Sequence, residues 1–293
     1  MKKLIRYMKN KKVGGTPISL VNNIYYKLEF YNPSGSIKDR AAYNILENYF
    51  KLGILKENDT VVIATSGNMG ISFAYFGKKF KIQVVIVMPD NASIERINIL
   101  ESYGASIILT DSKQGMKGSI EKSLELSKEY GYIVIDQFDN IYNKLANIET
   151  GKEILRDIPD VDYIVCGIGT GGTISGICEY IKQIDAKVKV IGIEPYESSI
   201  ITKGEKGVHL IQGIGAGFIP PLINLKDIYQ IKRIKGQEVI EKFKNDNPVL
   251  LGLSSIACDI AARKILEKEP NAKIVVICAD GIDRYESVKK WSI

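Results

Sequence analysis

Histidine and cysteine are scarce in this chain. Among 293 residues there is one histidine, His209, and the four cysteines show no paired short spacing. This scarcity leaves little from which to build a zinc centre, a Ser-His-Asp triad or a Cys-His pair, so no metal site is predicted. The cysteines lie mostly inside apolar runs such as IVCGI and VVICAD, which predicts buried free thiols in a reducing compartment. Acid–base chemistry is then left to lysine, to carboxylates or to a cofactor.

Long hydrophobic runs and clustered charge are absent as well. No run reaches the length needed to span a membrane, and the basic start MKKLIRYMKNKKVGG is followed by no small-residue cleavage site. The net charge of +6 comes from 40 Lys and Arg against 34 Asp and Glu, and it is spread along the chain, which disfavours nucleic-acid binding. With 45% hydrophobic and 25% charged residues, the sequence predicts a globular cytoplasmic protein with no nucleic-acid or membrane partner.

From residue 60 onward the chain alternates short β-branched runs with longer amphipathic ones. Strands are predicted at TVVIAT, IQVVIVMP, ASIILTD, YIVIDQF, DYIVCGI, VKVIGIEP and AKIVVICAD, with helical stretches between them. This alternation favours mainly parallel sheets covered on both faces by helices. Because DNIYNKLANIETGKEIL is a helical stretch able to link one sheet to another, two closely packed three-layer α/β domains are predicted. Functional loops in such folds follow the carboxyl ends of the strands.

The loop GIGTGGT, residues 167–173, joins a predicted strand to a predicted helix. Its four glycines allow close approach of an anion, and the helix start offers free N–H groups. Gly167, Gly169 and Gly172 also satisfy G-x-G-x-x-G, with Glu194 near the position of a ribose-binding acid. A dinucleotide, another phosphate and tight structural packing therefore all remain open for this loop, and an NAD-dependent dehydrogenase is one alternative function.

Two further loops carry polar groups, and the first of them precedes a predicted helix. TSGNMG, residues 65–70, offers hydroxyl, amide and backbone donors suited to a carboxylate, although Ser66 or Asn68 could instead cap the helix. NPSGSIKDR, residues 32–40, places Lys38 behind a glycine-bearing turn. Most lysines are solvated charges, but a Schiff-base lysine needs a fixed position and a lowered pKa.

The three loops together resemble the motifs of one family. From VGGTPISL near residue 13 to DRYES near residue 287, the chain resembles the cysteine synthase (O-acetylserine sulfhydrylase) and cystathionine β-synthase family of pyridoxal-phosphate enzymes. The resemblance implies the tryptophan-synthase-β-like fold (fold type II) with pyridoxal 5′-phosphate as cofactor. It further implies an N-terminal domain over residues 30–145, with a mobile part that closes over the substrate. Residues 1–29 and 146–293 would form the C-terminal domain with the phosphate loop.

The same resemblance assigns roles to individual residues. Lys38 would be the Schiff-base and catalytic lysine, Asn68 would meet the 3′ oxygen of the cofactor, and Ser254 of GLSS would face the pyridine nitrogen. The cofactor phosphate would lie on Gly169, Thr170, Gly171, Gly172 and Thr173. The substrate would be bound by Thr65, Ser66, Gly67, Met69, Gln137 and Gly213.

The chemistry implied by the resemblance is β-replacement on a serine- or cysteine-type amino acid through an aminoacrylate. A neutral serine at the ring nitrogen suits β-elimination and β-replacement better than transamination, and the freed Lys38 would move the Cα proton. The wording GIGAGFIP favours O-acetyl-L-serine and sulfide as substrates, giving L-cysteine and acetate. With four motifs explained together, the dinucleotide interpretation becomes remote, and His209 is expected to be structural or to line the rim.

Departures from the family pattern keep other functions open. Met69 stands where the family usually has threonine, Ile256 follows GLSS in place of glycine, and the wording from Ala279 to Ile282 is unusual. These changes leave a second hypothesis, in which cysteine is the substrate and hydrogen sulfide is released with serine, lanthionine or cystathionine. A third hypothesis is an inactive binding or regulatory partner. The resemblance also implies a homodimer and, as a partner, a serine acetyltransferase whose C-terminal tail docks in the active site.

Overall fold

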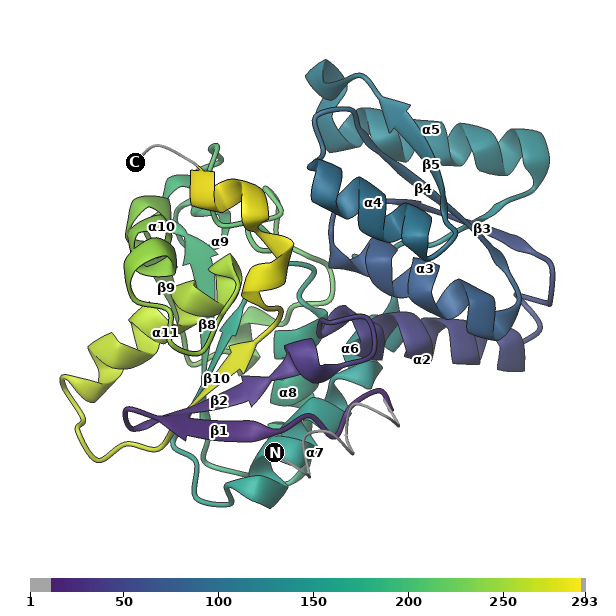
Figure 1. Ribbon diagram of the computed structural model, residues 1–293. Helices are drawn as coiled ribbons and strands as arrows, with labels where there is room; N and C mark the ends of the chain where they lie inside the picture. Colours follow the sequence, from purple (N-terminus) through teal and green to yellow (C-terminus); the bar gives the residue numbers. More distant parts are fainter. Residues whose placement is uncertain (1–11, 291–293) are drawn as a thin grey trace.

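The structure is a computed structural model that describes residues 12–290, and its elements form two lobes joined near their base (Figure 1). The basic start of the chain, residues 1–11, lies outside the described residues. Within residues 12–290, no helix combines the length and the apolar character needed to cross a membrane.

The larger lobe is built on a six-stranded sheet in the order β1-β2-β10-β7-β8-β9. Only β1 and β2 pair antiparallel, and every other neighbouring pair is parallel. The register places Val276 of β10 opposite both Tyr26 of β2 and Val165 of β7. The strands are β1 (Ile18–Val21), β2 (Ile24–Leu28), β7 (Tyr163–Gly167), β8 (Lys189–Pro195), β9 (Gln230–Ile234) and β10 (Ile274–Cys278).

Successive residues of these strands point to opposite faces, and both faces are buried. Tyr163 and Val165 belong to an apolar cluster with α10 (Gly236–Asn245) and α11 (Leu253–Leu266). Ile164 and Cys166 belong to a second cluster with α7 (Ile148–Asp157) and α8 (Gly172–Gln183). This period of two explains why the strands read as continuous hydrophobic runs in the sequence.

The smaller lobe holds a parallel four-stranded sheet in the order β5-β4-β3-β6. Its strands are β3 (Thr60–Ala64), β4 (Gln83–Pro89), β5 (Ser106–Thr110) and β6 (Ile133–Val134). Val61 and Ile63 pack in one apolar cluster with α2 (Lys38–Lys51), α3 (Asn68–Phe80) and α4 (Ile94–Ser102), whereas Val62 packs with Leu126 of α5 (Gly115–Tyr130). Both lobes therefore have three layers, as predicted.

The remaining elements are short. They are α6 (Ile141–Ala146), α9 (Ile200–Lys203) and 3-10 turns at Glu29–Tyr31, Ser112–Gln114, Tyr196–Ser198, Leu225–Asp227, Ile282–Arg284 and Glu286–Lys290. The strand predicted at YIVIDQF is reduced to Ile133–Val134, because the Asp136 carboxylate accepts the N–H groups of Phe138 and Asp139 and turns the chain. β1, β2, α2, β9 and α10 lie where no element was predicted. The boundaries proposed for the two domains stay a prediction.

Candidate active site

The turn before Lys38 is built from close contacts that require glycine. Gly35 has φ +94°, and a Cβ there would lie 2.7 Å from Nη2 of Arg284, which donates to the Ser34 carbonyl. The Asp39 carboxylate accepts the Ser34 N–H and hydroxyl. The Ile37 N–H donates to the Ala279 carbonyl at 2.8 Å. These bonds hold the start of α2 against the carboxyl end of β10.

Lys38 is the first residue of α2 and is half-buried. Removal of its amine from water lowers the pKa of Lys38, and the nearby Cys166 and Asp280 only partly oppose this effect. An amine with a lowered pKa in a fixed position is what attack on a carbonyl requires. Lys38 is therefore not an ordinary solvated lysine.

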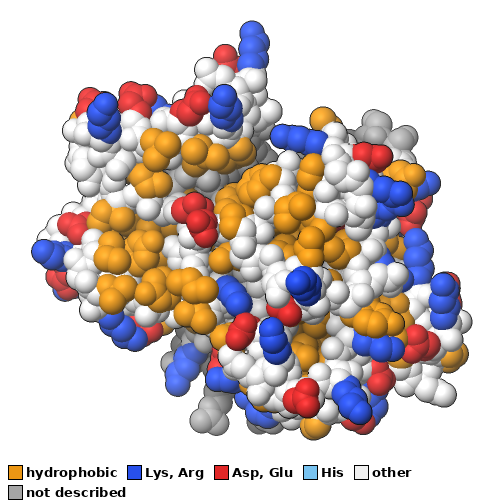
Figure 2. All heavy atoms as spheres, turned by 180° about the vertical axis from the view of Figure 1, so that it is seen from behind, with side chains coloured by type: hydrophobic (Ala, Val, Ile, Leu, Met, Phe, Trp, Pro, Cys, Tyr) orange, Lys and Arg blue, Asp and Glu red, His pale blue; other side chains and the backbone are white. Residues whose placement is uncertain are grey.

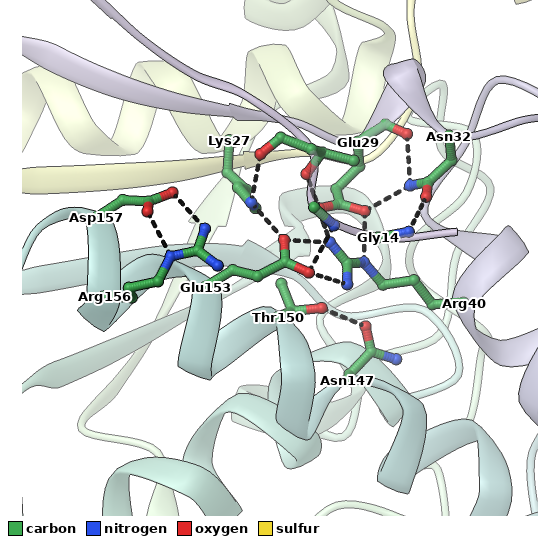
Figure 3. Close-up of polar contacts among 12 residues, drawn as sticks. Gly14, Lys27, Glu29, Asn32, Arg40, Asn147, Thr150, Glu153, Arg156 and Asp157 are labelled. Atoms are coloured by element: carbon green, nitrogen blue, oxygen red, sulfur yellow. Dashed lines mark hydrogen bonds and ion pairs between the residues drawn. The ribbon is translucent and has the colours of Figure 1, made fainter. Parts of the chain in front are cut away.

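A buried ion-pair network contacts both ends of the segment 32–40 that contains Lys38 (Figure 3). Arg40 donates to Glu29 at 2.8 Å and to Glu153 at 2.7 and 2.8 Å, and Lys27 donates to Glu153 at 2.6 Å. All four side chains are at most 3% exposed. Asn32, the first residue of the loop, donates to Glu29 at 2.7 Å. With two positive and two negative groups, the network links β2, the 3-10 turn after it, α2 and α7.

The loop TSGNMG lies between β3 and α3. Thr65 is tied to β4 by a bond from its N–H to the Val87 carbonyl at 3.0 Å, and its hydroxyl accepts the Gly67 N–H. The alternative in which Ser66 or Asn68 caps α3 is wrong, because Gly67 occupies the N-cap position and no side chain caps the helix. The side chains of Ser66 and Asn68 are thus not used as helix caps.

The structure differs from expectation at Met69. Its side chain is 1% exposed and belongs to the apolar cluster of the smaller lobe, with Phe73, Ile86 and Met88. The thioether therefore packs in the core, because the first turn of α3 directs it inward. Only the backbone of Met69 is left for the predicted substrate-binding role.

Asp280 is a site residue that the sequence reasoning missed. Its carboxylate, which follows β10, accepts from Asn68 Nδ2 at 2.6 Å and from the Tyr285 hydroxyl at 2.8 Å. Burial raises the pKa of Asp280, against the lowering effect of these two hydrogen bonds. Within residues 12–290, Asn68 Oδ1 and Asp280 Oδ1 are buried with no hydrogen-bond partner. The signal was an acid placed directly after a buried strand.

The loop from Gly169 to Thr173 forms a cradle at the start of α8. A Cβ on Gly169 would lie 2.5 Å from the Gly213 carbonyl, so only glycine permits this approach of two backbones. Thr170 accepts from Asn143 of α6 at 3.0 Å, and Asn143 also donates to the Gln137 carbonyl at 2.8 Å. Among the described residues, Ser175 Oγ in the first turn of α8 is buried without a partner. Free helix N–H groups and this hydroxyl fit a phosphate.

Asn143 is a second residue that the sequence reasoning missed. It joins the phosphate cradle to Gln137, a predicted substrate residue that is half-buried after β6. An asparagine within an amphipathic helical run gives no distinguishing signal in one sequence. Its position becomes evident only when α6 packs against the loop.

Ser254 lies in the first turn of α11 and is 6% exposed. A Cβ on Gly213 would be 3.9 Å from Ser254 Oγ, and one on Gly167 would be 3.9 Å from Ser254 Cβ. Ser254 is thus brought beside both glycine loops. Lys38 lies close enough to Cys166, the residue before Gly167, for the thiol to affect the pKa of the amine. The predicted cofactor residues therefore lie around one region at the carboxyl ends of the strands.

The two residues that supported other interpretations have structural partners. The Glu194 carboxylate accepts the N–H groups of Ile201 and Thr202 at the start of α9, at 3.0 and 3.1 Å, so it holds that helix in place of a ribose. His209 Nε2 lies 3.2 Å from the Gly215 carbonyl. Among the described residues, no group of three or more His, Cys, Asp or Glu side chains is arranged to hold a metal ion.

Comparison with known proteins agrees with this geometry. Residues 10–283 match the model of a family described as pyridoxal-phosphate dependent enzyme. The chain belongs to this family. It is 38% identical to cysteine synthase B of Campylobacter jejuni over 284 residues, which cover 94% of this chain and 95% of that protein. The resemblance to cysteine synthases is therefore confirmed, and the protein is a pyridoxal-phosphate-dependent enzyme.

Solved structures show the same fold. Cysteine synthase (OASS) of Entamoeba histolytica superposes with a TM-score of 0.91 at 35% identity, covering 98% of this chain and 91% of that one. A hydrogen sulfide-producing enzyme of Fusobacterium nucleatum gives a TM-score of 0.89 at 36% identity, covering 95% of this chain and 98% of that one. The fold of this pyridoxal-phosphate enzyme is the tryptophan-synthase-β-like fold.

Proposed function

We propose that the enzyme is a cysteine synthase that converts O-acetyl-L-serine and sulfide into L-cysteine and acetate. The observation that carries the proposal is the position of Lys38. Its amine has a lowered pKa, lies at the carboxyl end of β10, and is influenced by the charge of Asp280, whose carboxylate accepts from Asn68. Similarity to cysteine synthases of two organisms supports the choice of substrates.

Residues of both lobes would hold the cofactor. Lys38 would bind it covalently, Asn68 would use its second amide hydrogen toward the 3′ oxygen, and Ser254 would face the pyridine nitrogen. The phosphate would lie on Gly169 to Thr173, at the start of α8. Pyridoxal phosphate, when bound, supplies an aldehyde for covalent attachment and a ring that accepts electron density from the substrate Cα.

The other residues would bind and orient the substrate. The hydroxyls of Thr65 and Ser66, the backbone of Gly67 and Met69, and the amide of Gln137 are donors suited to the amino-acid carboxylate. Gly213, with φ +91° and no side chain, leaves room beside Ser254. Lys38 would take the Cα proton as the acetate leaves, and would return a proton to Cα after sulfide has added to Cβ.

A second candidate is release of hydrogen sulfide from cysteine, which the likeness to the Fusobacterium enzyme supports. The argument from Met69 no longer favours it, because that side chain lies in the core. The deciding experiment measures cysteine formation from O-acetylserine plus sulfide, and sulfide release from cysteine alone. Faster cysteine synthesis supports the first proposal, whereas faster sulfide release makes the second the main activity. Absence of both reactions in the cofactor-loaded protein would favour the inactive binding partner.

We also propose that the enzyme is a homodimer. The surface of α5 exposes Met116, Ile120 and Leu124 at four-residue spacing, and Leu109 of the edge strand β5 is half exposed. Figure 2 shows hydrophobic side chains gathered in patches on both lobes. Apolar stripes of this kind are typical of subunit contacts. In sedimentation experiments, L124E should shift the protein to monomer, whereas L52E, the same change at another exposed leucine, should not.

A partner and a location complete the proposal. A serine acetyltransferase tail that ends in a carboxylate would compete for the same donors as the substrate, so we expect O-acetylserine to displace it in a pull-down. All four cysteines are free and buried, which supports a reducing compartment such as the cytoplasm.

A further inference from the structure

The first residues of α4 reach from the smaller lobe to the larger one. Arg96 Nη1 donates to the Ser66 carbonyl at 2.8 Å, and Nη2 donates to Gln212 Oε1 at 2.5 Å. Ser66 belongs to the loop after β3, whereas Gln212 directly precedes Gly213 in the larger lobe. One guanidinium thus joins two loops whose neighbouring residues are proposed to bind the substrate.

Glu95, the residue before Arg96, also contacts a segment that is distant in sequence. Glu95 is hydrogen-bonded by its own backbone, by Ser93 and by Ser287, and these bonds lower the pKa of Glu95. Ser287 lies in the 3-10 turn Glu286–Lys290, in the C-terminal part of the chain. Leu100 is the only fully buried residue of α4, and Ile97 and Ile99 pack partly against the same core, so the polar contacts of Glu95 and Arg96 add links to segments distant in sequence.

We propose that Arg96 is a positioning residue that sets the distance between the loop of Ser66 and the loop of Gln212, whose neighbouring residues are proposed to bind the substrate. Its planar, forked guanidinium can donate in two directions at once, which a lysine ammonium does not reproduce with the same geometry. Its two acceptors are neutral oxygens, so the positive charge is not cancelled by an ion pair with either. That charge also lowers the pKa of Asp280, against the larger effect of burial, which places it electrostatically near the site.

This inference rests on the proposed function for its substrate, so the first test is kinetic. In R96A and Q212A, KM for O-acetylserine should rise about tenfold or more, the effect of one lost charge-assisted hydrogen bond. KM for sulfide, cofactor content and Tm should stay near wild type. R96K should recover only part of the affinity, and millimolar guanidinium should restore R96A. The control R156A removes an exposed arginine whose side chain donates to its neighbour Asp157, and it should change nothing.

The double variant R96A/Q212A separates a shared role from two independent ones. Because both side chains form one link, the effect of Q212A should largely disappear in the R96A background. If the two effects multiply, or if R96A lowers Tm and cofactor content together with affinity, the positioning role is wrong.

A second readout is independent of the reaction. In the holoenzyme without substrate, R96A should speed hydrogen–deuterium exchange in both loops, residues 65–68 and 212–215, whereas R156A should not. Faster exchange confined to α4 would overturn the proposal. If the wild-type protein fails to turn over O-acetylserine, the proposed function fails, but this exchange experiment still decides the role of Arg96.

Discussion

Removal of the Lys38 amine from water disfavours its positive charge. The motif GSIKDR predicted the identity of this residue, but its lowered pKa results from burial, which Cys166 and Asp280, more than a hundred residues away in sequence, only partly oppose. A single sequence does not bring such distant positions together. The residue type could therefore be predicted, whereas its chemical state could not.

Replacement of Lys38 by alanine should remove both the covalent attachment point and the proton carrier. We expect kcat/KM for cysteine synthesis to fall by about 10³-fold or more, together with loss of the visible absorption band of the holoprotein. K51A, at an exposed lysine paired only with Glu47, is the control and should keep activity and band. A K38A protein that retains both would show that the amine is not used.

Substitution of Asp280 tests whether the orientation of the Asn68 amide depends on its hydrogen bond to this carboxylate. In D280N the carboxylate that accepts from Asn68 and Tyr285 is replaced by a neutral amide with one acceptor oxygen. We expect the affinity of the apoprotein for pyridoxal phosphate to fall about tenfold, because Asn68 is no longer held in one orientation. Fluorescence titration with the cofactor measures this. D283N, at an exposed acid three residues on, should bind as wild type; equal affinity in D280N would contradict the role.

At the scale of elements, the pattern of hydrophobic residues predicted most strands of the two sheets. Strands buried on both faces, such as Ile274–Cys278, are readable because every position is apolar. Edge strands are less readable: β9 carries Lys232 and Arg233 beside Ile231, so its pattern resembles a loop. The loop from Gly169 to Thr173 could be singled out because glycine spacing is local, whereas its contact with Asn143 is not local.

The loop before α8 should lose its affinity for the cofactor phosphate if the backbones at Gly169 and Gly213 are forced apart. In G169A the new Cβ would meet the Gly213 carbonyl at 2.5 Å, so the phosphate loop and the GIGAG loop must separate. We expect cofactor affinity to drop by at least about tenfold, measured as the phosphate-dependent part of binding by comparing pyridoxal phosphate with pyridoxal. G204A provides the control: its φ of +73° costs about 1 kcal/mol of stability, with no neighbour within 4 Å. It should therefore lower stability but leave affinity intact.

At the scale of the whole molecule, the two sheets are joined by polar groups that no local pattern reveals. Glu153 of α7 and Arg40 of α2 are 113 residues apart, and each would read as an ordinary charged helix residue. The structure buries them with Lys27 and Glu29 (Figure 3). Fully satisfied networks of this kind fix one arrangement of elements, because a displaced partner leaves a buried charge unpaired.

The network predicts a specific acid sensitivity. Burial alone would raise the pKa of Glu153, but hydrogen bonds and charge from Arg40 and Lys27 lower it from 4.5 to about 2. A carboxyl whose folded pKa lies below its unfolded value stabilises the fold above pH 4.5. That contribution, about 3 kcal/mol for this shift, is lost as the pH falls from about 5 toward 2.

Comparison of wild type with E153Q isolates this contribution. At pH 7 the substitution leaves the two buried cations of the network, Arg40 and Lys27, with one buried anion, Glu29, so the free energy of unfolding in urea should fall by about 3–5 kcal/mol. Between pH 5 and 2 the wild-type value should decrease more steeply than that of E153Q, because only the wild type protonates Glu153 on unfolding. E149Q, on the same helix but exposed and paired with Lys152, should follow the wild-type curve. If the E153Q and wild-type curves ran parallel through this range, the buried network would not be what stabilises the junction at neutral pH.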